Sequence, residues 1–164
     1  MKNALRSPLA ALGLSLTMLS PALLPSARAD GAAPLARCTL KVVNALPGPG
    51  GIDPAITRLR TYLEKPPFSH WKSFKLLSEK DDELHPGGSA HYKLPNGKDA
   101  VVSYTEHLSV AKKHIVRGTL QVESAKGATA KTAFSLDEGG FFMFAGEDFN
   151  GGMLIYSLSC KTED

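Results

Sequence analysis

The chain has 164 residues, of which 19 are basic and 16 are acidic, and 43% of its residues are hydrophobic. About 135 residues follow the N-terminal segment described below, which is enough for one domain with an ordinary core. Three basic residues and no acidic residue lie in that segment, so the remaining chain has no net charge and a nucleic-acid partner is not expected.

The first 29 residues have the three parts of a secretory signal peptide. Lys2 and Arg6 are basic, residues 9–24 are largely apolar, and residues 27–29 read Ala-Arg-Ala. A transmembrane anchor is the competing interpretation, but the apolar stretch is shorter than the ~20 residues that a span requires. We therefore expect cleavage after residue 29, a periplasmic or secreted location, and no stable membrane anchor after cleavage.

Residues 30–36 are rich in alanine, and we expect them to form a flexible leader before a single β-rich domain over residues 37–164. The only two cysteines are Cys38, in the first predicted strand, and Cys160, in the last. In an oxidising compartment these two thiols are expected to pair. The pattern therefore predicts a structural disulfide that brings the first and last strands together.

The first predicted strand covers residues 38–46 and ends at the Pro-Gly-Pro-Gly-Gly sequence of residues 47–51. Asp53 followed by Pro54 is a strong helix start, because Asp caps free N–H groups and proline lacks one. Apolar residues at positions 56, 59 and 63 form one stripe, and two prolines follow at 66–67. We predict a helix over residues 53–64 that packs on a sheet.

The middle of the chain has the alternating pattern of antiparallel strands. Asn96-Gly97 between two apolar runs predicts a hairpin, and Lys126-Gly127 predicts another turn. The polar tract over residues 79–83 is expected to connect strands. The predicted strands cover residues 71–78, 88–94, 100–106, 114–123 and 130–136.

Residues 140–146 and 152–158 are two nearly continuous apolar runs. A strand that is apolar on both faces needs cover on both, so we expect this hairpin to be central in its sheet. The predicted fold class is α+β and mainly antiparallel β, a sandwich-like sheet with one N-terminal α-helix.

The glycine-bracketed hairpin over residues 139–158, together with Leu94-Pro-Asn-Gly-Lys-Asp-Ala upstream, resembles a group of short exported bacterial proteins for which no activity is known. The resemblance implies a signal peptide, one helix and a series of strands. It implies no functional residues.

No catalytic or metal-binding motif is present in the sequence, and no cofactor is expected. The histidines at 70, 85, 91, 107 and 114 lack metal-ligand spacing. Residues 146–152 have the composition of a calcium loop, but without its spacing they are typical of a turn.

Phe68, His70 and Trp71 lie in the predicted connection between the helix and the next strand. Aromatic side chains on loops are typical of binding surfaces, so these three residues are the candidate binding site. The competing interpretation is that the single tryptophan fills the core.

The leading hypothesis from the sequence is an exported binding or accessory module that contacts an envelope protein or a small ligand. One alternative is a secreted hydrolase or hydrolase inhibitor, with a site assembled from His91, His107 or His114 and nearby carboxylates. A third hypothesis is a structural envelope component with an exposed apolar patch on the last hairpin.

Overall fold

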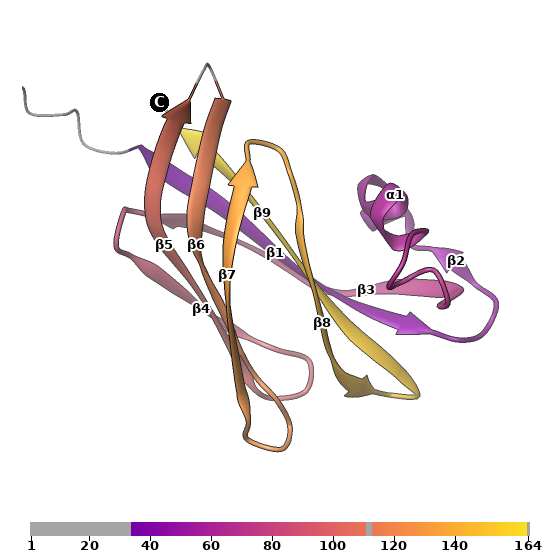
Figure 1. Cartoon of the computed structure of the whole chain (residues 1–164). Coiled ribbons are helices and arrows are strands. Elements are labelled where there is room, and N and C mark those ends of the chain that lie inside the picture. Colours follow the sequence, from indigo (N-terminus) through magenta and orange to yellow (C-terminus); the bar gives the residue numbers. More distant parts are fainter. Residues whose placement is uncertain (1–33, 111–112, 164) are drawn as a thin grey trace, which may run out of the picture.

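The computed structural model describes residues 34–110 and 113–163, and the predicted signal peptide lies outside them. Most of this part of the chain forms two sheets (Figure 1). The first sheet contains, in spatial order, β2 (Gly51–Ile52), β3 (Ser73–Leu84), β1 (Leu35–Leu46), β9 (Gly152–Glu163) and β8 (Phe142–Phe149). The second contains β4 (Ser89–Lys93), β5 (Asp99–Val110), β6 (Lys113–Glu123) and β7 (Thr129–Asp137). Neighbouring strands are antiparallel, except that the short β2 is parallel to β3.

The mainly antiparallel β class is therefore confirmed, but the helix is not N-terminal within the domain, because β1 and β2 precede it. The helical segment consists of a 3₁₀ turn, η1 (Pro54–Leu59), and a short α-helix, α1 (Arg60–Leu63). Asp53 caps its start, with Oδ1 accepting from the N–H of Ala55 and Oδ2 from the N–H of Leu76 in β3. The predicted apolar stripe is buried, so the periodicity identified the correct face although most of the segment is not α-helical.

The larger hydrophobic core lies between the two sheets. Alternate residues of β1 and β9 point toward the second sheet, among them Leu40 and Tyr156, and they pack with residues such as Val102 and Leu120. Figure 1 shows the four-stranded sheet in front of one half of the long β1 and β9 strands. One cluster of buried residues thus joins both sheets.

A smaller core lies on the opposite face of the first sheet, under the helical segment. Val43 and Ile155 point to this face and contact a group of buried side chains from the helix and its flanks. Figure 1 shows α1 over the end of the sheet that the second sheet leaves free. β1 and β9 therefore contribute side chains to two separate cores, which lie toward opposite ends of these strands and on opposite faces of the first sheet.

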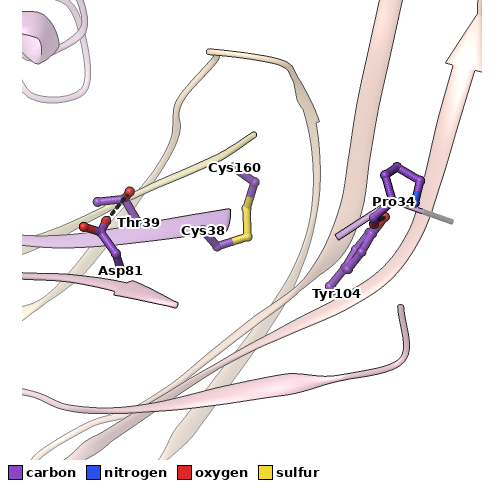
Figure 2. Close-up of a disulfide and its surroundings, with 6 residues drawn as sticks. All are labelled: Pro34, Cys38, Thr39, Asp81, Tyr104 and Cys160. Carbon is purple, nitrogen blue, oxygen red and sulfur yellow. Dashed lines mark hydrogen bonds between the residues drawn. A yellow bond between two sulfur atoms is a disulfide. The ribbon is translucent and has the colours of Figure 1, made fainter. Parts of the chain in front are cut away.

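The polar tract over residues 79–83 is part of β3, so its prediction as a connection was wrong. Glu79, Asp81 and Glu83 alternate on one face of the sheet and meet complementary residues of β1. Glu79 pairs with Lys41, and Asp81 accepts a hydrogen bond from Thr39, which Figure 2 shows. Cross-strand pairing makes this charged segment compatible with a strand.

Cys38 and Cys160 form the predicted disulfide (Figure 2). The two residues are direct partners in the register of β1 and β9, so the bond joins the first and last strands. Strand β1 begins at Leu35, and Ala36 is fully buried. The last residues of the predicted leader are therefore ordered sheet, because β1 pairs with β3 and β9 along its whole length.

The last hairpin is central only in part. β9 lies between β1 and β8 and is covered on both faces, whereas β8 is a sheet edge, so the prediction was wrong for β8. Phe142 and Phe144 pack on the inter-sheet core and Phe141 on the smaller core, so apolar side chains at this end of the hairpin reach both cores. The register shifts between Ala145 and Asp148, which leaves two residues of β8 opposite one of β9.

Candidate functional site

A cavity of about 240 Å³ lies where the edge strand of one sheet faces the edge strand of the other. One wall comes from the end of β6, the start of β7 and the turn between them, within residues 122–130. The other wall is formed by residues 144–147 of β8 and by Tyr156 of β9. The site is therefore built from both sheets, toward the ends of β7 and β8 that lie away from the turn joining these two strands.

Tyr156 is the buried polar residue of this cavity. It lies opposite Phe144 in the ladder, and the two rings stack at 6.2 Å between centroids. A Cβ atom placed on Gly146 would lie 2.5 Å from Cε2 and 3.2 Å from Cζ of Tyr156. The hydroxyl end of the ring thus lies beside the β8 residues that line the cavity, and only glycine leaves room for it.

The Tyr156 side chain is fully buried, and its hydroxyl has no hydrogen-bond partner among the described residues. Burial and, to a smaller extent, the negative charge of Glu147 raise the pKa of Tyr156 to about 12. Tyr104 differs: its side chain is also buried, but its hydroxyl donates to the carbonyl oxygen of Pro34 at 3.0 Å (Figure 2). An unpaired buried hydroxyl is unfavourable, so a ligand that bonds to Tyr156 would gain free energy.

Glu147 sits in the bulge of β8 and lines the same cavity. Its carboxylate accepts from the side-chain amide of Asn96 in the β4–β5 turn and from the N–H of Ala125 in the β6–β7 turn, the latter at 2.7 Å. One side chain therefore connects the β4–β5 and β6–β7 turns of the second sheet to the edge strand of the first. Both donors are neutral, and the described residues provide no ion pair to this carboxylate.

The three aromatic residues predicted as a binding site have different positions. Phe68 is buried in the smaller core, whereas His70 is exposed and contacts the Trp71 ring. Trp71 is half-buried and lines a second cavity of about 300 Å³ together with the Arg60–Glu64 ion pair. The structure thus leaves Trp71 and His70 as the accessible part of this predicted site.

Two of the three histidines proposed for a hydrolase come together. Nε2 of His107 and Nδ1 of His114 are 3.1 Å apart near the tip of the β5–β6 hairpin. His91 is exposed on β4 and is not part of this pair. Asp137, with Lys113 and Glu138, lines a shallow pocket beside His114.

The loop with the composition of a calcium site is the end of β8 and the turn to β9, where Asn150 has a positive φ of 46°. Within residues 34–110 and 113–163, no three His, Cys, Asp or Glu side chains are grouped as metal ligands. The large apolar side chains exposed in these ranges are Tyr62, Leu77 and Val110. None of the three belongs to the last hairpin, where the structural hypothesis placed an apolar patch.

No family model, curated protein or solved structure matches this chain. No helix in the described ranges has the length and apolar character needed to cross a membrane.

Proposed function

We propose that this protein is an exported, sandwich-like domain that binds a small ligand in the cavity between its two sheets. The observation that carries the proposal is a cavity with mainly apolar walls that is bordered by two polar groups, the Glu147 carboxylate and the buried, unpartnered hydroxyl of Tyr156. Ligand sites combine mainly apolar walls with a few polar groups that fix orientation. The cavity volume of about 240 Å³ suits a ligand of one ring or a short chain.

Two observations support export. The N-terminal sequence has the pattern of a signal peptide, and Cys38 and Cys160 are bonded. A disulfide that joins the end strands is typical of domains that work in oxidising compartments. We place this domain in the periplasm or the medium.

A fragment screen followed by backbone amide NMR tests the proposal. Small apolar fragments should shift amide signals within residues 122–130 and 144–147. Ala130→Phe, which places a ring in the cavity wall, should abolish these shifts. Ala133→Phe is the matched control, because Ala133 is on the same strand but points to the opposite face.

The position of the shifts decides between sites. Shifts confined to residues near Trp71 would show that the ligand binds at the site predicted from the sequence and not in the inter-sheet cavity. The absence of any saturable binding, with the fold intact, would refute the binding function.

The His107–His114 contact supports a second candidate function, a hydrolase. In this proposal the Nδ1–H of His114 donates to Nε2 of His107, which leaves Nε2 of His114 as the basic nitrogen, as in Ser-His-Asp triads. Ser109 is the partner of His114 in the β5–β6 ladder, so both side chains project from the same face. In this proposal Ser109 is the nucleophile, His114 the general base and His107 the positioning residue.

Hydrolysis of p-nitrophenyl acetate tests this second candidate. Ser109→Ala and His114→Ala should both abolish turnover, while His107→Ala should lower kcat and shift its pH profile. His91→Ala is the control and should change nothing. Turnover equal to buffer in the unaltered protein, or turnover that survives Ser109→Ala, would remove the hydrolase.

A further inference from the structure

We infer that the inter-sheet cavity selects a small organic cation, an ammonium group joined to an apolar body. This inference rests on the proposed binding function and adds the chemical class of the ligand. The Glu147 carboxylate and the aromatic pair of Phe144 and Tyr156 in one cavity are the observation that carries it.

The charge of the cavity is the first argument. Glu147 is the one acidic or basic residue among those that line the cavity, and its hydrogen bonds come from Asn96 and Ala125, which carry no charge. Hydrogen bonds from neutral groups hold a carboxylate in place without cancelling its charge. A half-buried, uncompensated carboxylate beside apolar walls is stabilised by a cation and repels an anion.

The aromatic wall is the second argument. Phe144 and Tyr156 lie with their planes 28° apart and form one side of the cavity next to Glu147. Ammonium groups bind to aromatic faces through the ring quadrupole, and this attraction grows where water is excluded. The opposite wall, with Val122 and Ala130, offers apolar surface for the body of the ligand.

The Tyr156 hydroxyl is the third argument. A phenol in its protonated form keeps lone pairs that accept a hydrogen bond from an ammonium N–H. A ligand carboxylate would also find a donor there, but it would bring a second negative charge next to Glu147. The hydroxyl is buried in the free protein, so it contributes affinity only where the ligand displaces a neighbouring side chain, whereas the Glu147 carboxylate gives selectivity for the cation.

Three ligands of the same shape test the inference by titration calorimetry at neutral pH: 2-phenylethylamine, 2-phenylethanol and phenylacetate. We expect the amine to bind at least ~tenfold more tightly than phenylacetate, with the alcohol between them. Added salt should weaken amine binding and leave alcohol binding nearly unchanged. Phenylacetate binding as tightly as the amine would overturn the inference while leaving the binding function in place.

Glu147→Gln should lower the affinity for 2-phenylethylamine to that for 2-phenylethanol, because glutamine has the shape of glutamate without its charge. Glu123→Gln is the matched control, since Glu123 is also near the β6–β7 turn but pairs with Lys98 and does not line the cavity. A preference for the amine that survives Glu147→Gln contradicts the assigned role. If Glu147→Gln does not fold, the ligand series and its salt dependence in the unaltered protein decide the inference. Failure of all three ligands to bind would instead count against the proposed function.

Discussion

Cys38 lies directly opposite Cys160 in the pairing of β1 with β9, and the two sulfur atoms are bonded across 122 residues of sequence. The strands that the bond joins are thus the first and the last of the fold. The chain between them contributes every strand of the second sheet. The disulfide therefore restricts nearly the whole unfolded chain.

Removal of this disulfide should lower the free energy of unfolding by ~4 to 5 kcal/mol, the value that chain entropy assigns to a loop of this size. Urea denaturation with and without reductant measures the change. The double variant Cys38→Ser/Cys160→Ser is the control and should not respond to reductant. A midpoint that reductant leaves unchanged in the unaltered protein would contradict this prediction.

Leu154 is fully buried in β9 between the two sheets. Leu154→Ala should cost about 2 to 5 kcal/mol of unfolding free energy, because it leaves a cavity in the larger core. Leu77→Ala, at an exposed position of β3, should cost much less. Phe142→Ala should fall between the two, since Phe142 lies on the sheet edge and is only half-buried.

Gly118 leaves room for the ring of Phe134. A Cβ atom at this position would lie 2.0 Å from the carbonyl oxygen of Ser103, which is backbone and cannot move aside. Gly118→Ala should destabilise the domain by ~1 to 3 kcal/mol, the usual cost of overpacking. Gly48→Ala meets no atom within 4 Å and should leave the thermal midpoint nearly unchanged. Equal effects of the two substitutions would contradict the close approach of β6 to β5.

Tyr156→Phe and Tyr104→Phe remove the same atom from two equally buried rings. The Tyr104 hydroxyl has a partner in Pro34, so its loss should cost ~1 kcal/mol. The Tyr156 hydroxyl has no partner among the described residues, so its loss should cost little or even stabilise the domain. Chemical denaturation of both variants measures the difference, and an equal cost would show that Tyr156 is hydrogen-bonded in the free protein.

The same tyrosine predicts a loss of stability at high pH. The pKa of Tyr156 is about 12 in the folded protein against its ordinary 10.0, so the folded state binds the phenolic proton more tightly. The stabilisation that this tighter proton binding gives to the folded state is complete below pH 10 and is lost as the pH rises toward 12. Burial raises the pKa values of Tyr92 and Tyr104 in the same direction. Unfolding free energies measured across this interval should fall less steeply in Tyr156→Phe.

The sequence was most informative where local rules decide the structure. The Asp53-Pro54 start and the apolar residues at 56, 59 and 63 located the helical segment and its buried face. Asn96-Gly97 located the turn between β4 and β5. These signals depend on neighbouring residues, whose preferences hold before the rest of the chain folds.

Long-range pairing explains what the sequence did not reveal. Residues 79–83 have the composition of a loop, and they become a strand because β1 supplies Arg37, Thr39 and Lys41 opposite their acidic side chains. Nothing near these residues in the sequence indicates that partner. The apolar runs of β8 and β9 are alike, so the sequence could not show which strand is central. Only the pairing of β9 with β1 places β9 inside the sheet and β8 at its edge.

The cavity was missed for a related reason. Glu147 and Tyr156 belong to one hairpin, but the opposite wall comes from residues 122–130 in the other sheet. One local signal was present, since Gly146, Glu147 and Asp148 end the apolar run of residues 141–145 inside the strand. A glycine inside a strand often marks a bulge, and bulges are frequent at sheet edges and beside active sites.

The bulge of β8 also affects how molecules of this protein meet one another. β8 is an outermost strand of its sheet, and a regular outermost strand invites a second molecule to add its own strand and begin aggregation. At Gly146 and Glu147 the bulge makes the spacing of backbone donors and acceptors irregular, and the side chain of Glu147 is charged. The same two residues that shape the cavity therefore help to keep concentrated protein from forming continuous intermolecular sheets.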